Sequence, residues 1–170
     1  KIGTKTETVN REGIDIVFAV DVSKSMLSED IAPSRLEKTK QIISQIINNL
    51  SGDRVGIVAY AASAFPVLPI TTDYGAAKLF LQGMNTDIVS SQGTSLSDAI
   101  ELSTSFFADD KSRSKLIVLL SDGEDHDFEV EEALKEAKKK NLKIITVGLG
   151  TEKGGPIPVK IGGNAISFKR

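Results

Sequence analysis

Residues 14–25 have the sequence IDIVFAVDVSKS, and this stretch decides the fold. Apart from Asp15, its first seven residues are apolar and rich in β-branched and aromatic side chains, which predicts a strand buried on both faces. Asp21 ends the strand, and a short turn with alternating serines follows it. Buried strands of this kind form the parallel sheets of α/β proteins, in which ligands bind beyond the carboxyl ends of the strands.

Similar stretches predict four more strands, at residues 55–60, 64–70, 116–120 and 142–148. The segment 64–70 contains Pro66 and Pro69, which lack the backbone N–H of a central strand. It also follows residue 60 after a short link, as a hairpin does, and a tight hairpin requires antiparallel pairing. We therefore expect this segment to form an antiparallel edge strand.

Helical patterns lie between the predicted strands, at residues 34–50, 73–81, 95–107 and 128–140. The first and third begin with capping boxes, Ser34 with Glu37 and Ser95 with Asp98. Strands that alternate with helices predict an α/β fold, a doubly wound and mostly parallel six-stranded sheet with helices on both faces. We expect one domain over residues 1–170, with its core at about residues 14–150 and a loop and short hairpin at 151–170.

Composition excludes several classes of function. The chain of 170 residues has 21 Lys and Arg against 23 Asp and Glu, so its net charge of −2 gives no electrostatic case for nucleic acid. The absence of cysteine excludes disulfides, thiol catalysis and cysteine-bound zinc, and the single His126 excludes a multi-histidine site. No apolar stretch approaches the ~20 residues of a membrane span, and no signal peptide opens the chain.

Oxygen-bearing side chains follow the predicted strands at the edge where ligands bind. Asp21, Ser23 and Ser25 follow the first strand, Asp122 follows the strand 116–120, and Thr94 precedes the third helix. Such hard ligands suit Mg²⁺ first, or Mn²⁺ and Ca²⁺. Because hydroxyls are neutral, two carboxylates do not fully neutralise a divalent ion in this setting. An acidic side chain of a protein partner can then replace a bound water.

The pattern Asp21-x-Ser23-x-Ser25, then Thr94, then Asp122, resembles the metal-ion-dependent adhesion site of von Willebrand factor A (VWA) domains, over about residues 14–150. The resemblance implies that the three hydroxyls approach a divalent metal and that the two carboxylates bind it directly or through water. It also implies a binding module and not an enzyme.

A narrower resemblance extends from the strand through Pro33-Ser34-Arg35 to residues 63–74 and Gly154-Gly155-Pro156. These motifs are similar to those of bacterial Bat (aerotolerance operon) proteins. That resemblance implies a parent anchored in the inner membrane, a periplasmic location for this domain, and partners among other Bat-operon proteins with a MoxR-type ATPase system. The family domain continues beyond the hairpin, so the carboxyl-terminal part of the fold is expected to be truncated.

Alternative functions remain at this stage: a chelatase-like subunit, a surface adhesin, or a Mg²⁺-dependent phosphatase. The phosphatase is disfavoured because Ser23 stands where haloacid dehalogenase-like enzymes have a second aspartate. Ser95 and Asp98 are expected to cap a helix rather than bind metal. Met26 and Leu27 form either a packing pair or an exposed apolar rim. The cluster Asp125, His126 and Asp127 is expected to be a solvated loop, with a role at the rim of the metal as the alternative.

Overall fold

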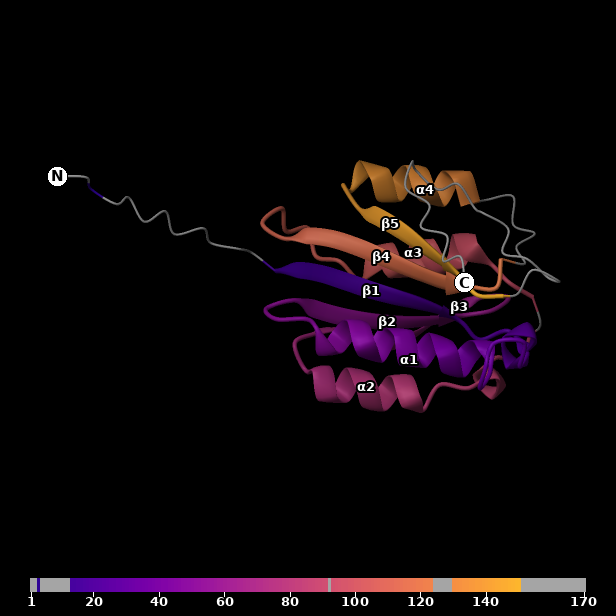
Figure 1. Ribbon diagram of the computed structural model, residues 1–170. Helices are drawn as coiled ribbons and strands as arrows, with labels where there is room; N and C mark the ends of the chain where they lie inside the picture. The colour runs from indigo at the N-terminus through magenta and orange to yellow at the C-terminus, as the bar shows by residue number, and fades with distance from the viewer. Residues whose placement is uncertain (1–2, 4–12, 92, 124–129, 151–170) are drawn as a thin grey trace.

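A computed structural model describes residues 3, 13–91, 93–123 and 130–150. Its centre is a five-stranded sheet with the order β3-β2-β1-β4-β5 (Figure 1). The strands are β1 (Ile14–Asp21), β2 (Arg54–Tyr60), β3 (Ala64–Thr71), β4 (Ser114–Ser121) and β5 (Lys143–Gly148). The pairs β1–β2, β1–β4 and β4–β5 are parallel, and only β3 runs antiparallel, at the edge beside β2.

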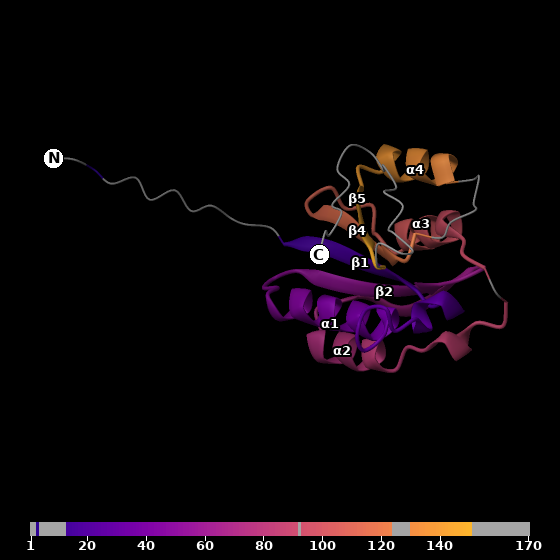
Figure 2. The ribbon, with the colours of Figure 1, turned by 45° about the vertical axis from the view of Figure 1, so that its right-hand side comes forward.

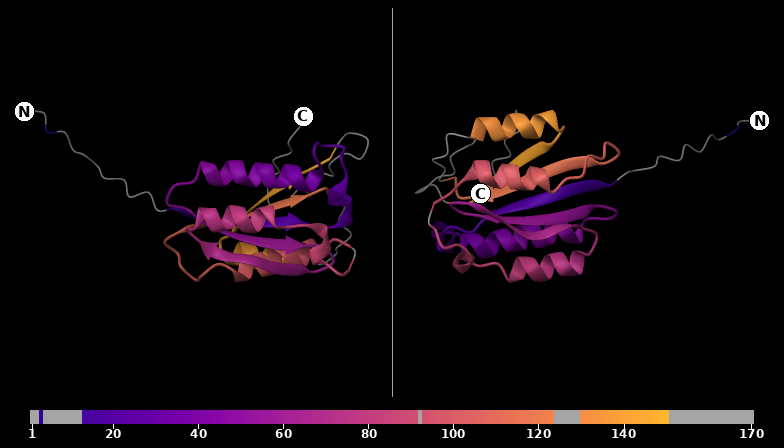
Figure 3. Two further views of the ribbon diagram at one scale, coloured as in Figure 1. Left: turned by 90° about the horizontal axis from the view of Figure 1, so that it is seen from below. Right: turned by 180° about the vertical axis from the view of Figure 1, so that it is seen from behind.

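Helices cover both faces of the sheet. The helices are α1 (Arg35–Asn48), α2 (Tyr74–Gln82), α3 (Leu96–Ser105) and α4 (Val130–Lys139), with short 3₁₀ turns η1 (Lys24–Leu27) and η2 (Thr86–Ile88). α1 and α2 lie together on one face, and α3 and α4 lie on the other, as Figures 2 and 3 show from three further directions. None of the described helices is both long and apolar enough to cross a bilayer.

The two faces of β1 belong to two hydrophobic cores. Ile16, Phe18 and Val20 pack in the core that contains α1 and α2, whereas Val17 and Ala19 pack in the core with α3 and α4. Successive side chains of a strand point to opposite faces, so a strand covered on both sides must be apolar at every position. This explains why the sequence of β1 is continuously apolar rather than alternating.

The predicted fold class is confirmed, and so is the edge strand. β3 pairs antiparallel with β2 after a short link in which Ala61 N–H donates to the carbonyl of Ser63 at 2.9 Å. Both predicted caps are present, since Ser34 Oγ accepts from Glu37 N–H at 3.1 Å and Ser95 Oγ accepts from Asp98 N–H at 3.3 Å. Ser95 and Asp98 therefore serve as the expected helix cap.

The strand number needs correction for the part of the chain that the structure describes. Five strands are present there and six were predicted. The sequence supplied an apolar stretch for each of the five, whereas the sixth followed from the general architecture and had no stretch of its own. The hairpin predicted at residues 151–170 lies outside the described residues.

Candidate metal centre

Asp21 is the buried carboxylate at the carboxyl end of β1. Its Oδ1 accepts a hydrogen bond from Ser23 N–H at 2.9 Å, and its Oδ2 accepts one from Ser121 Oγ at 3.1 Å. One donor comes from the turn that follows β1 and the other from the end of the neighbouring strand β4. The side chain of Asp21 is therefore fixed by both strands at the edge of the sheet.

The 3₁₀ turn η1 brings the two serines toward β4. Met26 N–H donates to the carbonyl of Ser23 at 3.0 Å, which closes the turn. The hydroxyls of Ser23 and Ser25 lie 3.1 Å apart, and Ser25 Oγ donates to Asp122 Oδ2. Four of the five predicted ligands thus converge at one point from two loops.

Thr94 lies at the same edge, one strand farther along. Ser95 N–H donates to the carbonyl of Ala61 at 2.6 Å, which holds this loop beyond the end of β2. The preceding Gly93 has φ of +131°, a conformation that glycine adopts without a steric penalty. Among the described residues, the hydrogen bonds that join the candidate ligands run between Asp21, Ser23, Ser25 and Asp122, and they do not include Thr94.

The electrostatics of the two carboxylates fit a bound cation. The pKa of Asp21 is raised from 3.8 to about 6, mainly by burial and in part by the charge of Asp122, although hydrogen bonds from Ser23 and Ser121 oppose the shift. Asp122 is itself buried. Two neighbouring buried carboxylates repel each other, and a divalent ion would stabilise both in their charged form.

The set of donors is also of the kind that a hard cation prefers. Within the described residues, no three His, Cys, Asp or Glu side chains gather in a way that could hold a metal, so the candidate set drawn from them combines carboxylates with hydroxyls. Ser23, Ser25 and Thr94 supply them beside the two carboxylates. Oxygen ligands of this kind suit Mg²⁺ or Ca²⁺ better than Zn²⁺ or Cu²⁺.

Sequence reasoning missed two residues at this edge. Ser121 bonds to Asp21 through its hydroxyl, and its position directly before Asp122 was the available signal. Arg35 approaches Asp122 Oδ2 with Nη1 at 3.2 Å, and the motif Pro33-Ser34-Arg35 had drawn attention only as part of a resemblance. No local pattern predicts that contact, because the two residues are 87 positions apart.

The residues around the turn divide into buried and exposed. Met26 is fully buried in the core of α1 and α2, whereas Leu27 is 53% exposed. The expectation of a packed residue therefore holds for Met26 alone, and the expectation of an exposed apolar residue holds for Leu27 alone. Asp125, His126 and Asp127 lie outside the described residues, so their prediction stands as it was.

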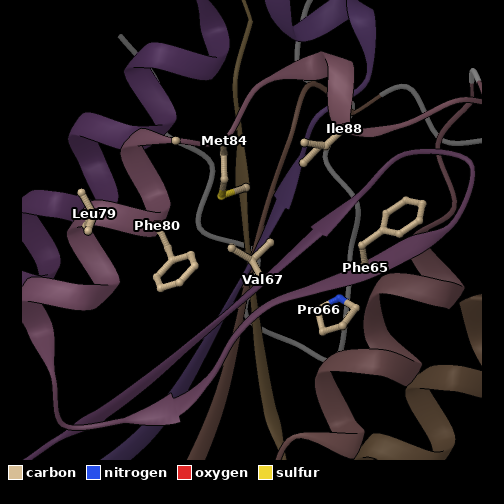
Figure 4. A pocket seen from close by; sticks show the side chains of 8 residues that line it. Phe65, Pro66, Val67, Leu79, Phe80, Met84 and Ile88 are labelled. Carbon is tan, nitrogen blue, oxygen red and sulfur yellow. The ribbon is translucent and has the colours of Figure 1, made fainter.

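A second surface feature is an apolar groove of about 390 Å³ between β3, α2 and η2. Figure 4 shows the side chains around it, all of them uncharged. The lining residues are Phe65, Pro66, Val67, Leu79, Phe80, Gly83, Met84 and Ile88. The groove offers no group for metal binding or acid–base chemistry, so the candidate chemistry of the described residues belongs to the carboxyl edge.

The fold agrees with comparisons to known proteins. The family model for the von Willebrand factor type A domain matches residues 15–162. The chain belongs to the VWA family. The described sheet, mostly parallel and covered by helices on both faces, has the α/β architecture expected of that family.

Solved structures place this VWA domain among the Bat-like, aerotolerance-related proteins. BatB from Bacteroides thetaiotaomicron is 40% identical with a TM-score of 0.81, over 87% of this chain and 72% of that one. An aerotolerance-related membrane protein from Bacteroides fragilis is 35% identical with a TM-score of 0.79, over 93% and 77%. A mussel byssus matrix protein with a zinc-occupied adhesion-site motif has a TM-score of 0.71 over 82% of this chain and 36% of that one; at 19% identity it shows only the shared fold.

Curated relatives are longer than this chain. An uncharacterized protein of Borreliella burgdorferi is 30% identical over 155 residues, which cover 88% of this chain and 44% of that protein. A UPF0353 protein of Nocardia farcinica is 28% identical over 89% of this chain and 49% of its own length. The chain thus spans about half the length of the curated relatives it matches.

Proposed function

We propose that this VWA domain is a metal-dependent protein-binding module. Asp21 and Asp122 would supply carboxylates to a divalent cation, with Mg²⁺ favoured over Mn²⁺ and Ca²⁺, and Ser23, Ser25 and Thr94 would supply hydroxyls. The observation that carries the proposal is the pair of buried carboxylates among converging hydroxyls, where the pKa of Asp21 is raised to about 6. When bound, the ion would supply a positive charge with exchangeable coordination positions.

The proposed partner is a protein that presents an acidic side chain to the ion. Two carboxylates and neutral hydroxyls leave the bound ion able to attract a further anion. The exposed Leu27 stands two residues from Ser25 and offers apolar contact beside that anion, which favours a protein over a small acid. Other Bat-operon proteins, with the MoxR-type ATPase system, are the partners that family membership favours.

The proposed location is the periplasmic side of the bacterial inner membrane, in a membrane-anchored parent. The Bacteroides fragilis relative is described as a membrane protein, and a further similar structure comes from a membrane-spanning protein of Vibrio fischeri, at 32% identity with a TM-score of 0.55 over 81% of this chain and 71% of that one. We propose no catalytic role. Hydrolysis of a phosphate ester by the Mg²⁺-loaded domain, abolished in Asp21→Asn, would favour the phosphatase instead.

Titration calorimetry with Mg²⁺ and Mn²⁺ tests the metal site. We expect Asp21→Asn to weaken binding by more than about tenfold, because a ligand charge is lost while the shape of the side chain is kept. Asp109→Ala, which removes an exposed carboxylate before β4 at the opposite end of the sheet, is the matched control and should bind as the wild type does. Equal affinities for wild type and Asp21→Asn would show that the ion binds elsewhere.

A pull-down from native membranes tests the partner. The domain is immobilised and washed in parallel with Mg²⁺ and with EDTA, and Asp21→Asn serves as a third arm. We expect specific proteins only in the arm with Mg²⁺ and the wild-type domain. The same set of proteins in all three arms would contradict metal-dependent recognition and would leave a structural ion at most.

A further inference from the structure

Arg35, the first residue of α1, joins two carboxylates from different loops. Its Nε and Nη2 donate to the two oxygens of Asp30, each at 2.8 Å, and its remaining Nη1 donates to Asp122 Oδ2 at 3.2 Å. One edge of the planar guanidinium thus binds Asp30, and the remaining nitrogen binds Asp122, a candidate metal ligand. Only arginine has the fixed fork of donors that such a bridge requires.

The Asp122 end of the bridge is shielded from water. The side chain of Arg35 is 12% exposed, that of Asp30 is 20% exposed and that of Asp122 is fully buried. Hydrogen bonding to Asp30 raises the pKa of Arg35, so the guanidinium keeps its charge. At this depth water cannot easily replace the arginine on Asp122.

The charges around Arg35 indicate that it orients Asp122 and does not compete with the metal for it. A lone cation beside Asp122 would repel a divalent ion. Asp30 balances the charge of Arg35, however, so this ion pair adds no net charge beside the ion. Residues that hydrogen-bond to a metal ligand fix its direction and typically raise metal affinity.

Two backbone contacts extend the bridge into a closed ring. Ser28 N–H donates to the carbonyl of Ser25 at 3.1 Å, and Arg35 N–H donates to the carbonyl of Ser28 at 2.9 Å. Because Ser25 Oγ also bonds to Asp122, the ring is closed. It runs from Ser25 through Ser28 and Arg35 to Asp122 and back to Ser25. Ile31 N–H donates to Asp30 Oδ1 at 3.1 Å, which ties the middle of this segment to the same carboxylate.

We propose that Arg35 is a positioning residue of the metal site, which holds Asp122 toward Ser25 and couples residues 28–34 to metal binding. The inference rests on the proposed function, because it assigns a role toward the same ion. Segment 28–34 follows the exposed Leu27, and its residues Glu29, Ala32 and Pro33 are exposed too. Metal binding would then stiffen this exposed segment through the ring.

The test compares Arg35→Lys with Arg54→Lys. Lysine keeps the charge but lacks the planar fork that binds Asp30 through two nitrogens while a third reaches Asp122. Arg54 binds Asp15 through two nitrogens at 2.8 and 2.6 Å at the opposite end of the sheet, so its substitution removes a similar ion pair far from the metal. Mg²⁺ affinity is measured by calorimetry, and hydrogen exchange of residues 28–34 is measured with and without Mg²⁺.

We expect Arg35→Lys to weaken Mg²⁺ binding by about 10–100-fold and to abolish the Mg²⁺-induced slowing of exchange at residues 28–34. Arg54→Lys should retain both properties, even if its stability falls. If Arg35→Lys binds Mg²⁺ within about twofold of the wild-type affinity, or slows exchange at residues 28–34 as the wild type does, the positioning role of Arg35 is overturned. The metal site itself would stand. Absence of Mg²⁺ binding in the wild type would overturn both the proposed function and the positioning role of Arg35.

Discussion

Two aspartates at opposite ends of β1, Asp15 and Asp21, are both buried yet have opposite electrostatic surroundings. Asp15 bonds to Arg54 at 2.8 and 2.6 Å and to Arg113 at 2.7 Å. Burial alone would raise its pKa, but the hydrogen bonds and charges of the two arginines outweigh burial, and the pKa is lowered. Asp21 bonds only to uncharged donors in the described part of the chain, and its pKa rises to about 6.

The contrast separates a structural ion group from the proposed cation site. At the amino end of the strand the protein supplies the positive charge from its own side chains. At the carboxyl end it holds Asp21 beside Asp122 without a basic residue of its own on Asp21. An uncompensated charge is costly to bury, and such sites are candidates for function. The predictions below either widen this contrast or remove it.

The largest effect is expected for Asp15→Asn. The change leaves Arg54 and Arg113 without their carboxylate, and we expect the free energy of unfolding to fall by about 2–4 kcal/mol. The figure stays toward the lower part of the range because both arginines keep some contact with water. Urea unfolding measures it, and a fall below about 0.5 kcal/mol would show that the ion group is not a major source of stability.

Asp21→Asn should act in the opposite direction when no divalent metal is present. Asparagine keeps the shape but removes the charge that burial disfavours, so we expect the free energy of unfolding to rise by on the order of 1–3 kcal/mol at neutral pH. The same variant should lose the stabilisation that Mg²⁺ gives to the wild type. Urea unfolding with EDTA and with Mg²⁺ measures both, and a less stable variant in EDTA would contradict the assigned electrostatics.

The pH dependence should separate the two aspartates further. Asp21 has a pKa of about 6 when folded against an ordinary 3.8, so the folded state binds more protons between these values. Stability of the metal-free wild type therefore falls, relative to Asp21→Asn, as pH rises from about 4 to about 6, and the difference is constant above that. Below pH 4 the two should be equally stable in EDTA.

Asp15 should show the reverse behaviour. Because its folded pKa is lowered, its contribution is complete above 3.8 and is lost only as pH falls through the folded value. The deficit of Asp15→Asn should thus persist from neutral pH to pH 4 and shrink in stronger acid. Unfolding curves from pH 3 to 7 test this; a deficit that disappears between pH 4 and 6 would contradict the lowered pKa.

The smallest effect is expected at the pair of Glu136 and Lys139 on α4. Their charged groups lie 2.9 Å apart, but both side chains are well exposed. Ion pairs in water contribute little, so Glu136→Gln should change the free energy of unfolding by no more than the error of the measurement and leave Mg²⁺ affinity unchanged. A larger loss would show that an ion pair stabilises this domain even without burial, and would weaken the contrast drawn from β1.

Local sequence was sufficient for much of the fold. Continuous apolar stretches gave all five described strands, and Pro66 and Pro69 marked the edge strand because proline cannot take part fully in a central ladder. The capping serines Ser34 and Ser95 also lie where the local pattern predicted. No comparable local pattern indicated a sixth strand, so that prediction could not be assigned to any residues.

The position of the candidate site could be predicted as far as the order and direction of the strands could. Asp21, Ser23 and Ser25 follow one strand and Asp122 follows another. Parallel strands bring their carboxyl ends to one edge, so the sequence places these residues at that edge, and the pairing of β1 with β4 brings them together. The separate fates of Met26 and Leu27 did not follow, because neighbours in a 3₁₀ turn point in different directions and only the packed core decides which is buried.

The sequence by itself therefore determined the order of strands and helices along the chain, the antiparallel edge and the candidate oxygen ligands. The tertiary structure alone decided which charges meet. Arg35 reaches Asp122 across 87 positions, and Arg113 reaches Asp15 across 98. Such contacts depend on how distant segments pack, and no periodicity or spacing along the chain encodes them. The same packing leaves Asp15 neutralised at one end of β1 and Asp21 without a basic partner of its own, within the described residues, at the other.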